Sequence, residues 1–311
     1  RQIIRLGLYL REQFGVAPGQ RVALLSELRP EWLIADLAAL GLGAVSVAID
    51  PRLQGDALAD ALEDTGPSVT FVSGAAQKLL VSLDGRAPRH GRLIALDSAV
   101  TSDGVMSLHT LLEMGGTLDT PERAQSYRAE ARNLAPDQPA IRHYVQAPGG
   151  GWERIDLSQG EIIERLRVGW LGEPAQPGDL AYVSDPTVSL AGRLALYAFL
   201  GDGYTTTALA PAAGELSDLA ALHPTKIVAP AGLLAEAVRA GESRAEARPG
   251  SDGGWLRHAT RSAPLGRARR QQRAIRDTLG GRVRWIGSTD PLDSALAERL
   301  GGLAVVGPAL I

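Results

Sequence analysis

The fold of this sequence is restricted most by a regular alternation of short apolar runs with amphipathic segments. Four runs in the first hundred residues are predicted as strands, at residues 21–26, 44–49, 68–72 and 92–96. Helical periodicity is found between and before them, at residues 1–14, 31–42, 54–64 and 75–82. Strands that alternate with helices pair in parallel through right-handed crossovers. The first part of the chain is therefore predicted to be a doubly wound α/β layer.

The same alternation resumes in the second half of the chain. Strands are predicted at residues 179–183, 204–209, 226–228, 282–286 and 303–306, with helices between them. Residues 101–135 are more polar and are predicted to form short surface helices joined by Gly115-Gly116, and residues 241–254 are predicted to be a mobile loop. We therefore expect an α/β protein with two α/β subdomains and mainly parallel sheets, divided into residues 1–135 and 136–311.

Composition excludes several classes of function. The net charge of −3 gives no overall attraction to nucleic acid, and the absence of cysteine excludes disulfides and thiolate metal sites. The five histidines lack metal-ligand spacing, so no metal site is predicted. No apolar run reaches membrane-spanning length and no signal peptide opens the sequence, so a cytoplasmic location is expected. The basic run at residues 267–273 is interpreted as a solvated helix face, with at most peripheral membrane contact.

The glycines Gly149, Gly150 and Gly151 form a candidate anion-binding loop. They follow an apolar run at residues 139–145 and precede a helix that opens near Ser158, where Glu161 completes a capping box. A strand, a glycine loop and a helix are the parts of many phosphate sites. A working loop also carries hydroxyls and a lysine, whereas here the first charged residue after the glycines is Glu153. Two interpretations follow, a phosphate cradle or a turn that has lost that role, and Glu153 favours the second.

The segment Arg29-Pro30-Glu31-Trp32, continued to Val45, resembles the adenylate-forming (ANL, AMP-binding) superfamily, and within it the long-chain fatty acyl-CoA synthetases. Further segments resemble that family in the same order, at residues 135–140, 144–158, 184–193, 223–230 and 279–292. The resemblance covers nearly the whole chain. It implies the large N-terminal domain of an acyl-CoA synthetase of fatty acid metabolism, without the small C-terminal domain, which is expected to be absent from this sequence.

The resemblance also implies where a nucleotide and the catalytic groups would lie. The family-equivalent nucleotide positions are Gly149, Gly150, Gly151, Ser158, Ser288, Asp290 and Pro291, and the family-equivalent catalytic positions are Glu153, Ser189 and Arg193. Glu153 stands where the family has its loop lysine and Ser189 where it has a histidine, whereas Arg193 keeps the family's arginine. A glutamate in place of a lysine sets like charge against a triphosphate.

These departures leave two hypotheses for the function. The first is an acyl-CoA synthetase-like pseudoenzyme that has lost adenylation and acts as a ligand-binding or scaffold protein, with an acyl or carboxylate ligand, a protein partner and no cofactor. The alternative is an active ATP-dependent long-chain fatty acid–CoA ligase that uses ATP, Mg²⁺ and CoA, with Arg154 in place of the missing lysine. The replaced hydroxyls and lysine favour the first hypothesis.

Overall fold

A computed structural model describes most of the chain. The described residues are 1–83, 90–97, 105–146, 152–169, 175–184, 189–203, 205–210, 214–247, 264–300 and 304–306. The chain divides into two compact units, Arg1–Glu164 and Arg165–Ile311. The predicted α/β class is confirmed, since each unit contains a mainly parallel sheet covered by helices.

The first unit is built on a seven-stranded sheet with the order β5-β4-β3-β1-β2-β6-β7. Its strands are β1 (Arg21–Leu25), β2 (Val45–Ile49), β3 (Val69–Val72), β4 (Arg92–Ala95), β5 (Met106–Ser107), β6 (Pro139–Gln146) and β7 (Trp152–Ser158). All neighbours pair in parallel except β6 and β7, which form an antiparallel hairpin. Strand order reverses at β1, because β2 lies on one side of it and β3 on the other.

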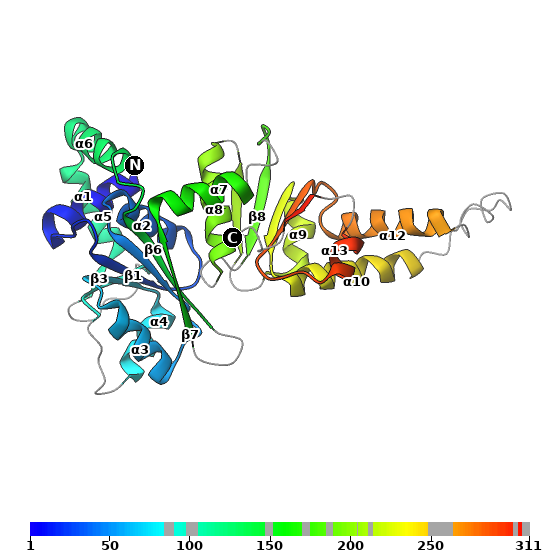
Figure 1. The fold of residues 1–311 in the computed structure, drawn as a ribbon, viewed down its shortest axis with the longest axis horizontal. Coiled ribbons are helices and arrows are strands. Elements are labelled where there is room, and N and C mark those ends of the chain that lie inside the picture. Colours follow the sequence, from blue (N-terminus) through cyan, green and yellow to red (C-terminus); the bar gives the residue numbers. More distant parts are fainter. Residues whose placement is uncertain are drawn as a thin grey trace. The chain divides into compact units, whose positions relative to one another are not determined.

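Helices cover both faces of this sheet. Helices α3 (Gly55–Thr65) and α4 (Gly74–Ser82) lie on one face, opposite α1 (Gln2–Phe14), α2 (Pro30–Gly41), α5 (Leu108–Leu118) and α6 (Pro121–Arg132) (Figure 1). Alternate strand residues such as Ala23, Leu25 and Val47 pack against Leu58 and Leu62 of α3. Local signals define the helix ends: Pro30 occupies the first turn of α2, and Gly15 closes α1 in the left-handed conformation.

The second unit carries a five-stranded parallel sheet with the order β12-β11-β10-β8-β9. Its strands are β8 (Leu180–Ser184), β9 (Thr206–Ala210), β10 (Lys226–Ala229), β11 (Trp285–Ser288) and β12 (Ala304–Val306), and its helices are α8 (Leu190–Asp202), α9 (Leu216–Leu222), α10 (Ala231–Ala247), α12 (Pro264–Thr278) and α13 (Ser294–Arg299). Successive strand residues point to opposite faces: Ala181 and Val183 pack against α8, while Tyr182 packs in the cluster that contains residues of α9, α10, α12 and α13.

Two predicted loops are helical in the structure. Gly115 and Gly116 lie inside α5, where Gly115 allows the helix to approach the backbone of Arg5 closely. Helix α10 continues to Ala247 through the first part of the predicted mobile loop; the rest of that loop lies outside the described residues. In α10, Gly241 is a close packing point against α12, so tertiary packing compensates for the low helix propensity of glycine.

The observed division after Glu164 differs from the expected boundary at residue 135. The difference arises because β6 hydrogen-bonds to β2 and extends the first sheet, so the glycine hairpin belongs to the first unit. Helix α7 (Gln159–Gly169) spans the point of division.

Candidate functional site

The glycine loop joins the two strands of the β6–β7 hairpin, and it does not open a helix. Gln146 pairs with Trp152 and Tyr144 pairs with Arg154, so the glycines lie at the tip of the hairpin, outside the described residues. Strand β7, 7 residues long, separates them from the first residue of α7. The predicted start of the helix near Ser158 agrees with the structure, but a strand that the sequence pattern did not indicate lies between the glycines and that helix.

The first backbone donors of α7 are satisfied by its own capping residues and by the Gln138 and Pro136 carbonyls. The Ser158 N–H donates to Glu161 Oε2 at 2.7 Å, and the Glu161 N–H donates to Ser158 Oγ at 3.3 Å. This is the predicted capping box. Ser158 thus stabilises the start of α7, and the backbone donors of residues 158–161 all have acceptors within the chain.

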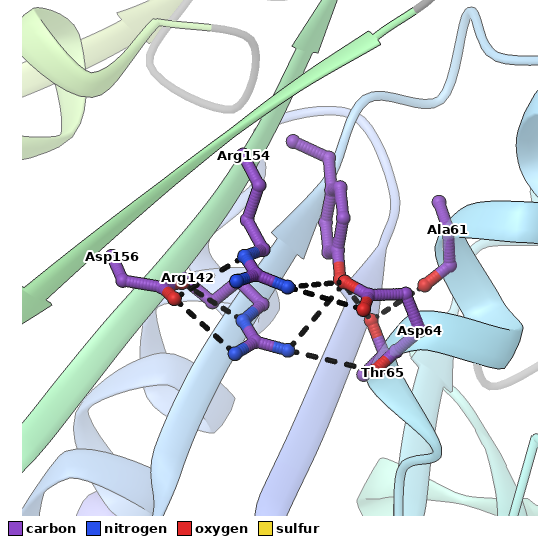
Figure 2. A network of polar contacts seen from close by, with 7 residues as sticks. Ala61, Asp64, Thr65, Arg142, Arg154 and Asp156 are labelled. Carbon is purple, nitrogen blue, oxygen red and sulfur yellow. Dashed lines mark hydrogen bonds and ion pairs between the residues drawn. The ribbon is translucent and has the colours of Figure 1, made fainter.

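A buried tyrosine anchors the hairpin to α3 next to the glycine loop. Tyr144, which has no exposed surface, donates its hydroxyl to Asp64 Oδ2 at 2.5 Å, and Thr65 Oγ1 lies 3.1 Å from the same hydroxyl oxygen (Figure 2). This hydrogen bond, with two neighbouring arginines, lowers the pKa of Asp64. Burial and the Asp64 carboxylate raise the pKa of Tyr144. A carboxylate in the last turn of a helix opposes the helix dipole, so Asp64 depends on these donors.

Two arginines on adjacent strands complete this network (Figure 2). Arg142 Nε and Nη2 donate to the two carboxylate oxygens of Asp156 at 2.8 and 3.2 Å. Arg154 Nη1 donates to both oxygens of Asp64 at 3.1 and 3.0 Å, and its Nε lies 3.3 Å from Asp156 Oδ2. With two arginines and two aspartates, the network is neutral and links β6, β7 and α3.

This arrangement separates the two charged residues that follow the glycines. Arg154 contacts both Asp64 of α3 and Asp156, so Arg154 and Asp156 share one face of β7. Glu153 and Ile155 lie on the opposite face of the strand. Glu153 is exposed and pairs through its backbone with Val145. On that face, the side chain closest to the glycines in sequence is therefore the acid Glu153. The first arginine after the glycines, Arg154, is held by Asp64.

In the second unit, the two residues at expected catalytic positions, Ser189 and Arg193, make hydrogen bonds to residues of α8. Ser189 caps this helix, because its Oγ accepts the Gly192 N–H at 3.4 Å. Arg193 is fully buried, donates from Nε to Tyr197 Oη at 2.8 Å and lies over the Tyr197 ring. Arg193 therefore lies inside the unit and not at its surface.

The last residue of β11 and the residues after it lie at the carboxyl edge of the second sheet, where parallel α/β sheets bind ligands. Ser288 is buried and donates to the Asp290 carbonyl at 2.7 Å, while Asp290 Oδ2 accepts the Ala231 N–H at 3.1 Å. Asp290 therefore caps α10 from another part of the chain. Pro291 is exposed beside it. The Thr289 hydroxyl is buried without a hydrogen-bond partner among the described residues.

A buried charge cluster that the sequence did not indicate lies at the opposite, amino edge of the same sheet. Asp179 accepts from Arg284 at 2.6 and 2.8 Å and from Thr225 at 2.9 Å, and Lys226 Nζ lies 3.4 Å from it. Burial alone would raise the pKa of Asp179, but the Gln176 N–H, Arg284, Thr225 and Lys226 lower it to about 2. Lys226 is the first residue of β10, and Asp179 and Arg284 directly precede β8 and β11, so the cluster joins the starts of three neighbouring strands.

No group of three or more metal-ligating side chains is found in the described ranges. No helix among the same residues is long and apolar enough to cross a membrane.

Comparison with known proteins gives matches over different parts of the chain. The family model described as AMP-binding enzyme matches residues 1–144. The long-chain-fatty-acid–CoA ligase FadD15 of Mycobacterium bovis is 25% identical over 217 residues, which cover 69% of this chain and 35% of that protein. The chain thus spans about a third of the length of this curated relative.

Solved structures share the fold at low sequence identity. A benzoate CoA ligase from Burkholderia xenovorans superposes with a TM-score of 0.67 at 17% identity, over 98% of this chain and 53% of that one. The A domain of a carboxylic acid reductase from Segniliparus rugosus, in complex with AMP and a co-purified carboxylic acid, gives a TM-score of 0.64 at 19% identity, over 98% and 51%. The common fold therefore extends over both units of this chain.

Proposed function

Because this chain is a relative of the adenylate-forming, AMP-binding enzymes and has an acyl-CoA ligase-like fold, we propose that it binds an acyl or carboxylate ligand without adenylating it. In this proposal it is a non-catalytic ligand-binding or scaffold protein, a pseudoenzyme of the family, and a protein partner receives or senses the ligand.

The observation that carries the proposal is the pairing of Arg154 with Asp64. Adenylation needs cationic groups that stabilise the charge spread over the transferring phosphoryl group. Arg154 is the nearest candidate to replace the family's lysine, and both oxygens of Asp64 hold it against α3. Glu153 adds a negative charge next to the loop. The described residues therefore do not fit a triphosphate with its Mg²⁺.

The other family-equivalent positions support the same conclusion. Ser158, Ser189 and Asp290 each cap a helix, and Arg193 is engaged by Tyr197. Each of these side chains has a structural contact that explains its presence without a nucleotide. The ligand class comes from the relatives, whose names specify fatty acid, benzoate and co-purified carboxylic acid ligands.

The alternative function is an ATP-dependent long-chain fatty acid–CoA ligase that uses ATP, Mg²⁺ and CoA. Its support is the retained Arg193 and the three glycines at the hairpin tip. It requires Arg154 to leave Asp64 and turn toward the loop, against two hydrogen bonds and the neighbouring Asp156. That cost makes the non-adenylating function the better supported one. For either function we propose a cytoplasmic location.

Titration calorimetry separates the two functions. We expect no heat from ATP–Mg²⁺ at concentrations up to about 1 mM, and binding of a long-chain fatty acid in the micromolar range. Pyrophosphate release in the presence of ATP and the same fatty acid is expected to stay at background. Micromolar affinity for ATP–Mg²⁺, or pyrophosphate release that depends on the fatty acid, would establish the ligase and refute the proposal.

A further inference from the structure

A cavity of about 400 Å³ lies at the carboxyl edge of the first sheet. Its lining includes Arg29, which follows β1, and Leu96 and Asp97, which follow β4, together with first-turn residues of α1, α2 and α5. Strand order reverses at β1, and the helices after the neighbouring strands β1 and β3, α2 and α4, cover opposite faces of the sheet (Figure 1). The segments after these two strands therefore diverge, and doubly wound sheets bind ligands at such a point.

The lining of this cavity combines apolar and charged side chains. Its apolar part is formed by Pro30, Ile34, Leu96, Leu108 and Leu112. Leu96 and Leu108 are buried, whereas the side chains of Arg29, Glu31 and Asp97 are 24%, 37% and 30% exposed. The charged groups therefore lie at the mouth of the cavity. This size and composition are typical of a site for a small molecule.

Arg29 is shared by two carboxylates at this mouth. Its Nε donates to Glu31 Oε2 at 2.9 Å, and its Nη1 donates to Asp97 Oδ1. The other oxygen of Asp97 accepts the Gly74 N–H at 2.7 Å, whereas Glu31 Oε1 accepts no hydrogen bond from the described residues. Two carboxylates and one guanidinium leave one negative charge in excess.

This excess of carboxylate selects the charge of a ligand. An anion would meet both acids, and the guanidinium between them is already engaged by both. The first turns of α2 and α4, whose dipoles favour negative charge, already have Glu31 and Asp97 beside them. His109 also lines the cavity, and its Nε2 lies 3.3 Å from Oε1 of a further acid, Glu113. A cation is therefore favoured at the mouth.

We propose that this cavity binds a small organic amine in its ammonium form. The ammonium group donates to Glu31 Oε1, and a short aliphatic chain lies against Ile34, Leu108 and Leu112. This ligand has the opposite charge to the carboxylate ligand proposed above, so its binding does not depend on that of the acyl ligand. For an amine with about seven non-hydrogen atoms we expect a dissociation constant on the order of 1 mM.

Ligand-observed NMR of the whole chain with hexylammonium tests the proposal. Hexanol, which has the same chain and no charge, is expected to bind about tenfold more weakly, and hexanoate is expected not to displace hexylammonium. Glu31→Gln, which removes the charge of the acceptor, is expected to weaken hexylammonium binding about tenfold. Arg29→Gln is expected to tighten it about threefold, because the competing cation is removed.

Glu63→Gln, at an exposed position of the same unit, is the matched control and is expected to bind hexylammonium like the wild type. Circular dichroism checks that the variants are folded; if Arg29→Gln does not fold, hexanol and Glu31→Gln still decide. The proposal is overturned if Glu31→Gln binds hexylammonium as well as the wild type does, or if hexanol binds equally well. It is overturned equally if hexanoate displaces hexylammonium or if folded Arg29→Gln binds it more weakly, since either result identifies a site for anions.

Discussion

At the residue scale, the chemistry of the candidate site depends on two neighbours that point to opposite faces of β7. Arg154 is bound by Asp64 and Asp156, whereas Glu153 is exposed next to the loop. In the sequence, the anion Glu153 and the cation Arg154 follow each other directly after the loop. The alternation of the strand leaves only the anion on the free face.

Restoring the family's lysine therefore is not expected to restore adenylation. We predict that Glu153→Lys leaves pyrophosphate release in the presence of ATP and a long-chain fatty acid at background, because the loop hydroxyls and the family's histidine at Ser189 are still missing. Glu153→Gln serves as the control for loss of the acid alone. Fatty-acid-dependent turnover in the lysine variant would show that one charge had blocked an otherwise working site.

Asp179 decides how the second unit responds to acid. Its folded pKa of about 2 lies below the ordinary value of 3.8, so its contribution to stability is complete above pH 3.8 and is lost as the pH falls through about 2. We predict that Asp179→Asn lowers the free energy of unfolding at neutral pH by about 3 kcal/mol, since Lys226 and Arg284 lose a buried partner.

Urea denaturation at neutral pH and near pH 3 measures both effects. The wild type is expected to lose stability between these conditions, and the Asp179→Asn variant is expected to lose less. Asp137→Asn, at an exposed position, is the control. An equal loss in the Asp179 variant would mean that other carboxylates govern the acid response.

At the element scale, Asp290 stabilises the start of helix α10, although it lies far from that helix in the sequence. Its carboxylate accepts the Ala231 N–H at the first residue of the helix. We predict that Asp290→Ala lowers the free energy of unfolding by about 1 kcal/mol, the usual value of a helix cap, and leaves fatty acid binding unchanged. Thermal denaturation and calorimetry give the two quantities, and Asp290→Asn, which retains an acceptor, should lose less. Loss of binding without loss of stability would assign Asp290 to the ligand site instead.

The packing of α10 on α12 depends on a single glycine. A Cβ atom at Gly241 would lie 2.7 Å from the Ile275 Cα, so the helices must separate to accept it. We predict that Gly241→Ala destabilises the chain by about 1–3 kcal/mol in chemical denaturation. Gly232→Ala in the same helix meets nothing within 4 Å and is expected to be neutral or to stabilise by up to about 1 kcal/mol. Similar values for the two variants would refute the close contact.

At the scale of the whole molecule, three hydrophobic clusters of the described residues each lie within one unit. One lies between the first sheet and helices α3 and α4, and two lie on the faces of the second sheet. We predict that Tyr144→Phe, which removes the hydrogen bond to Asp64, increases amide hydrogen exchange within residues 1–164, whereas Asp179→Asn increases it within residues 165–311. Hydrogen exchange with mass spectrometry locates the change. Equal increases in both units would mean that they unfold as one cooperative body.

The order of the elements could be predicted from the sequence alone. Alternating apolar runs and helical periodicity indicated the parallel sheets, and capping residues such as Ser158 with Glu161 indicated the start of α7. These features are local: they depend on residues within about one helical turn or one strand of each other. The order of the weak motifs along the chain was enough to indicate a resemblance to the adenylate-forming family, and the AMP-binding enzyme model matches residues 1–144.

Tertiary structure alone decided what the charged residues do. Asp64 lies 90 positions from Arg154, and Asp179 lies 105 from Arg284, so no local pattern could pair them. Strand β7 was missed for a different reason: residues 152–158 contain no continuous apolar run, and the strand is defined by its hydrogen bonds to β6. Burial and long-range pairing are properties of the folded chain, and they hold Arg154 against α3. The sequence alone had allowed Arg154 to replace the missing lysine of the glycine loop.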